Sequence, residues 1–208
     1  MARTSILCAV VALCSLSAAA QPPNQTPALL KGPADWRFEK MPIPPRFAPD
    51  IKLTGFEEAR FAPGMFDTGS PNYFTYVLTV SANGTEPLDA AAIKDFLDKY
   101  YKGLSAGVGR RKQLAPDVSQ INAVVTPAPS SQAAPSSQGA SGSYEAKVTF
   151  FDTFNDGRKI ALNMEIRVTA KPAAKKTFVR LLISPQPPAA EVWKKLHDIE
   201  KTIHLDGP

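Results

Sequence analysis

The sequence predicts an α+β fold: an antiparallel sheet with two packed helices, in a single domain that carries a disordered internal insertion. The clearest sign is Lys159–Thr169, where large apolar residues occupy every second position, as in a strand with one buried face. Apolar residues at helical spacing follow Asp89 and recur near the end of the chain, which predicts the two helices. Short connections between the strand-like segments favour antiparallel pairing.

The first 20 residues have the features of a secretory signal peptide. Arg3 supplies a positive charge, and the apolar stretch Ile6–Leu16 follows. As a helix this stretch would extend roughly 16 Å, too short for a hydrocarbon core of about 30 Å. The small residues Ala18–Ala20 fit a signal peptidase, so cleavage is expected after the last of them. Cys8 and Cys14 both lie in the removed segment, so the mature chain would be free of cysteine.

Residues 21–35 are polar and rich in proline, and they predict a flexible leader. Residues 36–76 hold nine of the 18 aromatic residues of the chain, together with six prolines. Because the prolines exclude a long helix, we expect an irregular but buried arm that wraps the core. The aromatic side chains can form core, or they can line an open pocket or exposed patch that holds an apolar or peptide ligand. The candidate binding residues are Trp36, Phe61, Phe66 and, in the last helix, Trp193.

The arm leads into the first regular elements. Tyr73–Val80 alternates and predicts a strand. Asp89 is placed to cap a helix, and Gly103 is expected to begin its end. The apolar face of this helix is formed by Ile93, Phe96, Leu97, Tyr100, Tyr101 and Leu104.

Residues 121–126 are a further candidate strand, and residues 127–143 follow as a low-complexity segment. This segment is rich in Ser, Pro and Ala and has no large apolar side chain, so it predicts a disordered insertion within one domain, residues 36–208. Residues 144–151, 159–169 and 178–184 then predict a three-stranded meander, with Asn155–Gly157 as a hairpin turn. A helix from about Ala189 closes the chain, with Val192, Leu196, Ile199 and Ile203 in one stripe.

Two stretches carry a resemblance to known proteins. The first joins W-R-F-E-K-M-P-I-P-P-R-F-A-P-D at residues 36–50 to G-F-E-E-A-R-F-A-P-G-M-F-D at residues 55–67, and the second is S-P-Q-P-P-A-A-E-V-W-K-K-L-H-D-I-E at residues 184–200. Together they resemble a group of exported, uncharacterised bacterial proteins, which implies an envelope location and no particular activity. The closing strand and the helix with its tryptophan are also similar in layout to PsbP/Mog1-like domains.

Residues 103–107 match G-x-S-x-G, the nucleophile elbow of serine hydrolases, which makes Ser105 a candidate nucleophile. That elbow requires a strand before the serine and a helix after it, whereas a helix precedes Ser105 here. We therefore expect a glycine-rich helix end rather than a catalytic turn.

His197, Glu200 and His204 lie on one side of the last predicted helix, where two imidazoles and a carboxylate could hold a metal ion. The alternative is the half-exposed flank of a helix with two ordinary histidines. Glu57 and Glu58 are expected on a solvated strand edge, although with Glu39 they could also pair as acid and base.

The sequence as a whole favours an exported, non-enzymatic binding or accessory module of the bacterial envelope, located in the periplasm or outside the cell. Its partner would be an envelope protein, a peptide or an apolar ligand, and no cofactor is expected. A small exported hydrolase and a structural or assembly subunit are the alternatives. The mature net charge of about +4, without a basic stripe, argues against nucleic acid. No later apolar run reaches the roughly 18 residues of an integral membrane segment.

Overall fold

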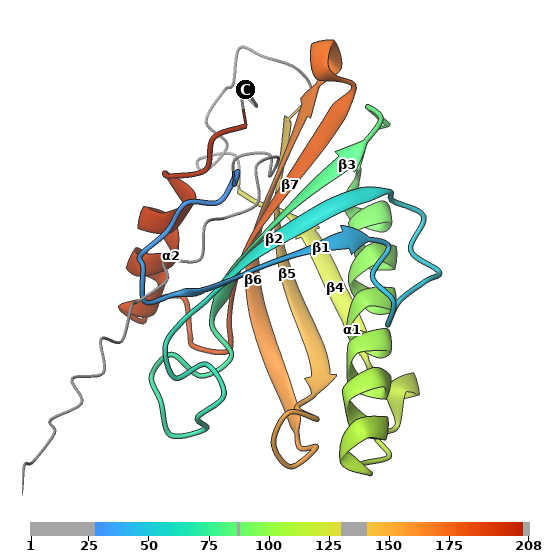
Figure 1. Cartoon of the computed structure of the whole chain (residues 1–208), viewed down its shortest axis with the longest axis vertical. Coiled ribbons are helices and arrows are strands. Elements are labelled where there is room, and N and C mark those ends of the chain that lie inside the picture. The colour runs from blue at the N-terminus through green and yellow to red at the C-terminus, as the bar shows by residue number, and fades with distance from the viewer. Residues whose placement is uncertain (1–27, 87, 130–140, 206–208) are drawn as a thin grey trace, which may run out of the picture.

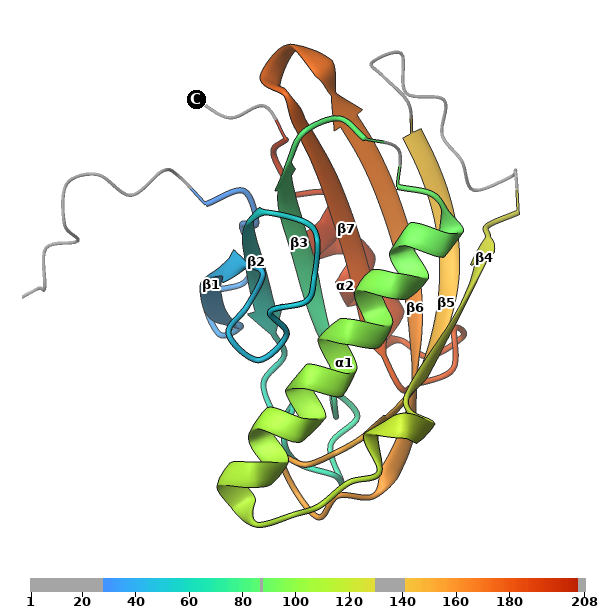
Figure 2. The same cartoon turned by 90° about the vertical axis from the view of Figure 1, so that its right-hand side faces the viewer.

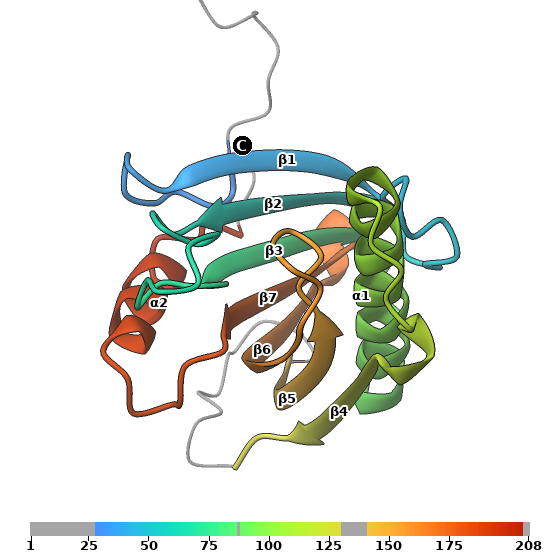
Figure 3. The same cartoon turned by 90° about the horizontal axis from the view of Figure 1, so that it is seen from below.

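The predicted antiparallel sheet with two packed helices is confirmed; the sheet has seven strands, and one helix lies on each of its faces (Figures 1 and 3). The computed structural model describes residues 28–86, 88–129 and 141–205; the expected signal peptide lies outside them. The strand order is β1-β2-β3-β7-β6-β5-β4. The strands are β1 (Arg37–Ile43), β2 (Gly55–Phe61), β3 (Tyr76–Asn83), β4 (Asn122–Pro127), β5 (Ser141–Phe151), β6 (Lys159–Lys171) and β7 (Lys176–Ser184). The α-helices are α1 (Ala90–Lys112) and α2 (Val192–Glu200), and short 3-10 turns lie at Val118–Gln120 and Pro172–Ala174.

The predicted meander of β5, β6 and β7 is confirmed and forms one half of the sheet. Gly157 has a φ of +77°, a left-handed conformation that a glycine adopts at little cost, and it makes the turn between β5 and β6. The alternating residues of β6 bury Leu162, Met164, Ile166 and Val168 in the core beneath α1.

The aromatic arm is more regular than predicted, because residues 37–43 and 55–61 form β1 and β2. Pro42 lies within β1, opposite Phe56. β1 is at the edge of the sheet, where a residue without an N–H is tolerated, so the proline does not prevent a strand. The next strand begins later than expected, at Tyr76, because Phe74 has a positive φ of 48°.

Helix α1 begins as predicted, but it does not end at Gly103. The Asp89 carboxylate accepts a hydrogen bond of 2.8 Å from the backbone N–H of Ala92 and caps the helix. The helix continues to Lys112 and ends at Gln113, whose φ is 58°. Gly103 instead allows a close contact: a Cβ there would lie 2.1 Å from the carbonyl oxygen of Phe47. The glycine is therefore explained by packing against the loop after β1.

Helix α2 covers the other face of the sheet with a smaller core. Trp193 is 3% exposed and its indole N–H donates to the Gln186 carbonyl, at 3.2 Å. Leu30 is fully buried beside the helix and forms a β-bridge with Ile203. The expected leader is thus anchored at Leu29 and Leu30, which are both buried, and Leu30 belongs to this second core.

The insertion between β4 and β5 is shorter than the composition suggests. Pro127 pairs with Tyr144, and Ser141–Ser143 belong to β5. Residues 130–140 of the predicted insertion lie outside the described part of the chain.

Candidate functional site

A cavity on the α1 face lies between the helix and strands β1–β3. Helix α1 packs closest to β4 and β5, at the far side of the sheet (Figure 2). The other half of that face is covered by side chains and by the loops after β1 and β2 rather than by a second helix. A cavity of about 620 Å³ is left there.

Apolar and aromatic side chains line most of this cavity. Two of the predicted binding residues, Phe61 and Phe66, are among them. The remaining apolar lining comes from Met41, Pro42, Pro45, Phe47, Met65, Phe74, Tyr76, Tyr100, Leu104, Val108 and Phe154. Several of these rings pack against each other: the ring centroids of Phe66 and Phe154 are 5.2 Å apart, and those of Phe47 and Tyr100 are 5.0 Å apart. The aromatic arm thus supplies both core and pocket, the two roles that the sequence left open.

Four charged side chains line the cavity, namely Arg37, Glu39, Arg46 and Arg111, and we call this part of the lining the mouth because its three arginines are exposed to solvent. Arg37 is paired with Glu39 at 3.0 Å, and its guanidinium lies over the rings of Phe61, at 5.0 Å, and Phe66, at 5.5 Å. With three arginines and one glutamate, the mouth carries a net positive charge over an apolar interior.

A buried polar cluster adjoins the cavity. Glu57 is 1% exposed and its Oε1 accepts a hydrogen bond of 2.9 Å from the Tyr100 hydroxyl. Within the described residues, its Oε2 has no hydrogen-bond partner. Burial raises the pKa of Glu57 to about 7; the bond from Tyr100 lowers that pKa and the charge of Glu39 raises it. Glu57 does not itself line the cavity, whereas Tyr100 does.

Glu58 is equally buried but on the other face of the sheet, so both glutamates depart from the expected solvated strand edge. Its Oε1 lies 2.9 Å from Lys40 Nζ, and its Oε2 accepts a hydrogen bond of 2.9 Å from the Leu30 N–H. β2 is covered on both faces, by α1 and the arm on one side and by residues 29–36 on the other. A strand covered on both faces buries adjacent residues.

Ser105 does not lie on a nucleophile elbow. It is fully buried in the middle of α1, and its hydroxyl donates to the Phe151 carbonyl at 3.1 Å. Gly103 and Gly107, the two glycines of the motif, both face Phe47. The motif therefore serves helix–loop packing, and a substrate could not reach this serine.

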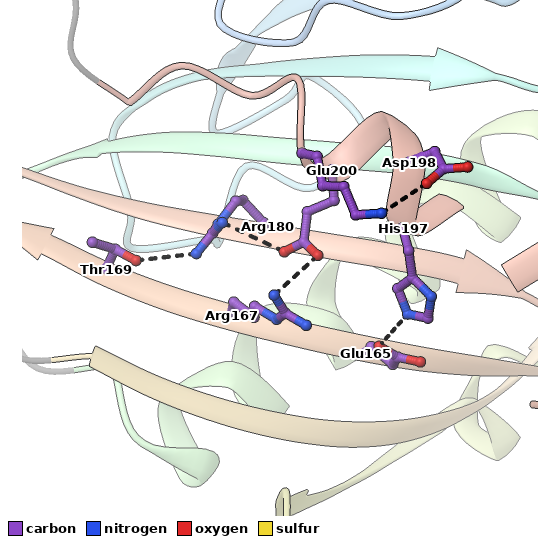
Figure 4. A network of polar contacts seen from close by, with 8 residues as sticks. Glu165, Arg167, Thr169, Arg180, His197, Asp198 and Glu200 are labelled. Atoms are coloured by element: carbon purple, nitrogen blue, oxygen red, sulfur yellow. Dashed lines mark hydrogen bonds and ion pairs between the residues drawn. The ribbon is translucent and has the colours of Figure 1, made fainter. Parts of the chain in front are cut away.

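The candidate metal ligands on α2 point to different partners (Figure 4). His197 Nε2 lies 2.8 Å from Glu165 Oε2, while the Glu200 carboxylate lies 3.2 Å from Arg167 and 3.5 Å from Arg180. His204 lies beyond the helix, where its backbone N–H donates to the Leu29 carbonyl. Within the described ranges no group of three His, Cys, Asp or Glu side chains could hold a metal ion.

The two tryptophans proposed as binding residues lie on the α2 face, away from the large cavity. Trp36 is 5% exposed and Trp193 3%, and both belong to the smaller core. Trp36 lines a hollow of about 630 Å³, similar in volume to the cavity on the α1 face, and Trp193 lines one of about 280 Å³, but neither presents an open ring.

Sequence reasoning named Glu39 and Glu57 but missed the arginines of the site. Arg46 and Arg111 are 65 positions apart, and only the return of the chain along α1 brings both to one mouth. Tyr100 was predicted as core, although it also lines the cavity and contacts Glu57. One signal was available: Glu57 and Glu58 lie within the aromatic-rich segment that is expected to be buried, which is inconsistent with a solvated strand edge.

Comparisons with protein-family models, with curated proteins and with solved structures found no match for this chain. Neither helix of the described residues is long and apolar enough to cross a membrane.

Proposed function

We propose that this protein is an exported, non-enzymatic binding module of the bacterial envelope, and that it holds an apolar ligand in the cavity between α1 and β1–β3. The observation that carries the proposal is the cavity itself, about 620 Å³ in volume and lined mainly by aromatic and aliphatic side chains. Sites for small ligands have volumes of roughly 300–1,000 Å³ and a few polar groups at defined positions, and this cavity fits that description.

The rigid surroundings of the cavity support binding rather than collapse. Phe74 and Tyr76 belong to the buried core, and Tyr76 shares a hydrogen bond of 2.5 Å with Tyr101 of α1. The walls are thus held by the same contacts that hold helix and sheet together. A preformed cavity binds without an ordering penalty for its own side chains.

The two alternative functions have less support. A hydrolase would need an accessible nucleophile, and Ser105 is fully buried with its hydroxyl hydrogen-bonded. An assembly subunit would need a broad apolar face, yet only Phe38, Phe66 and Val124 are large exposed hydrophobic residues in the described part of the chain. Of these, Phe66 lines the cavity.

A neutral fluorescent probe tests the proposal. N-phenyl-1-naphthylamine should bind the mature protein with increased fluorescence, and Leu104→Trp should weaken this binding by about tenfold, because the indole would occupy space that the probe needs. Leu104 is half-buried at the cavity wall, so the larger side chain can be accommodated there without unfolding the core.

Val124→Trp is the matched control, because it adds the same side chain at an exposed position outside the cavity. Both variants should melt within a few degrees of the parent protein. Equal probe binding by the parent and Leu104→Trp would disprove binding in this cavity.

Export is tested by the N-terminus of the protein recovered from the cell. We expect the mature chain to start at Gln21, after removal of both cysteines with the signal peptide. Intact mass and N-terminal sequencing of the periplasmic and culture fractions measure this. A recovered protein that still reacts with a thiol reagent would contradict the prediction.

A further inference from the structure

Arg46 and Arg111 stand out at the mouth of the cavity because their charges are uncompensated. Both side chains are exposed, and neither makes an ion pair or hydrogen bond with any residue that the structure describes. Arg37, the third arginine, is already engaged by Glu39 at 3.0 Å. Two free guanidinium groups beside an apolar interior are complementary to a ligand with an anionic end.

The close contact between α1 and the loop after β1 explains why these two arginines share one mouth. Phe47 packs on the helix at Gly103 and Gly107, and a Cβ on Gly107 would lie 3.4 Å from the Phe47 Cβ. Arg46 directly precedes Phe47, and Arg111 is one helical turn beyond Gly107, on the same side of the helix. Both can therefore approach one bound group.

Residues from several turns of α1 line the cavity. Its helical wall consists of Tyr100, Leu104, Val108 and Arg111, a single stripe that spans about 16 Å at 1.5 Å per residue. Apolar side chains occupy this stripe until its last member, which is Arg111. An extended acyl chain along the stripe would place its polar end at that arginine.

We infer that the ligand is a fatty acid, whose single acyl chain occupies the cavity and whose carboxylate lies between Arg46 and Arg111. The inference rests on the proposed function and names its ligand class. A guanidinium group binds a carboxylate with two parallel hydrogen bonds, and an apolar cavity accepts the tail. Glu39 lies at the same mouth and would repel a doubly charged phosphate more strongly than a carboxylate.

Competition against bound N-phenyl-1-naphthylamine tests the inference with matched ligands below their critical micelle concentrations. Dodecanoate and dodecanol have the same chain and differ in the head group. The ratio of the concentrations at which they displace the probe therefore isolates the contribution of the charge. In the parent protein dodecanoate should displace the probe at about tenfold lower concentration than dodecanol, a modest ratio because the arginines are exposed to water.

The double variant Arg46→Gln/Arg111→Gln should reduce that ratio to less than about threefold, because it removes both guanidinium groups and keeps the cavity. Lys102→Gln/Arg110→Gln is the control. It also removes two positive charges, but both lie on α1 at positions that do not line the cavity, so the ratio should be unchanged.

The outcomes separate the inference from the proposed function. Equal displacement of the probe by dodecanol and dodecanoate would disprove the fatty acid as ligand but not binding in the apolar cavity. Displacement at lower concentration by dodecyl phosphate than by dodecanoate would disprove the preference for a carboxylate. An unchanged dodecanol-to-dodecanoate ratio in the arginine double variant would disprove the role of the two arginines. If neither ligand displaces the probe and Leu104→Trp has no effect on it, the proposed function itself fails.

Discussion

The two faces of the sheet differ in how they compensate the charge of a buried glutamate. Glu57 and Glu58 are adjacent in β2, so strand geometry points them to opposite faces. On the α2 face Glu58 is compensated by Lys40 and by the N–H of Leu30. On the α1 face Glu57 has one hydrogen bond, from the Tyr100 hydroxyl, and no cation pairs with it among the described residues.

On the α2 face the buried charge is paired, although Trp36 lines a hollow of about 630 Å³ there. Trp193 and Leu196 fill a small core, and Glu200 is held between Arg167 and Arg180 (Figure 4). The α1 face has the larger core, a cavity lined mainly by apolar side chains, and two arginines without an ion pair in the described part of the chain. An uncompensated buried carboxylate and uncompensated rim charges on the same face are typical of a site, whereas paired charges are typical of a structural surface.

The largest expected effect lies on the α2 face. Trp193→Ala should destabilise the domain by about 3–5 kcal/mol, because it removes a buried indole that joins α2 to the sheet. Urea unfolding of the variant measures this.

His197→Ala is the comparison within the same helix. The His197 side chain is 38% exposed and can replace its contact with Glu165 by water, so its loss should change stability by less than about 1 kcal/mol. If Trp193→Ala is neutral but abolishes capture of a partner, α2 is a recognition element and the α2 face is not purely structural.

The second effect concerns Glu57 and pH. Its pKa is raised from 4.5 to about 7 in the folded protein, so the folded state binds more protons than the unfolded state between these values. Stability from this group is therefore fully present below pH 4.5 and is lost as the pH rises through 7, by about 3 kcal/mol in total. Urea unfolding between pH 4.5 and 8 should show this fall, and Glu57→Gln should remove it.

Glu58→Gln sharpens this comparison. It removes the charge that faces Lys40 and accepts from Leu30, so it should destabilise the protein at pH 8 by about 1–3 kcal/mol. Glu57→Gln should be neutral or stabilising at the same pH. The same response of both variants would mean that the two faces do not differ in the way described.

A smaller effect is expected from the loop contact on the α1 face. Gly103→Ala would bring a methyl group 2.1 Å from the Phe47 carbonyl oxygen, so the loop must move, at a cost of about 1–3 kcal/mol. Probe binding should weaken as well, since Phe47 lines the cavity. In Gly107→Ala the added methyl group would lie 3.4 Å from the Phe47 Cβ, so this variant should have nearly the stability of the parent protein. Thermal melts and probe titration of both variants would contradict this account if the order were reversed.

The smallest effect is expected from the segment between β4 and β5. Replacing residues 130–140 by a few Gly and Ser residues should leave the melting temperature within a few degrees, because the cost of loop closure changes slowly with length. The segment contains no large apolar side chain that either face could bury. Loss of folding in the shortened protein would show that one of the two faces depends on it.

The sequence by itself determined the elements with a strong local pattern. Alternation in Lys159–Thr169, the glycine turn at Gly157 and the cap at Asp89 depend on residues close in the chain, so fold class and meander were predictable. Of the candidate site, the sequence identified Phe61 and Phe66, because an aromatic-rich segment indicates either core or pocket.

The tertiary structure alone decided which glutamate is compensated and where the charged mouth lies. Arg46 and Arg111 line one cavity because Phe47 packs on the helix at Gly103, a contact between residues 56 positions apart. Glu57 and Glu58 have the same local sequence context, yet one faces Lys40 and the other faces a tyrosine. Periodicity tells which residues share a face, but the partner that covers each face is chosen by long-range packing, and burial and charge compensation depend on that partner.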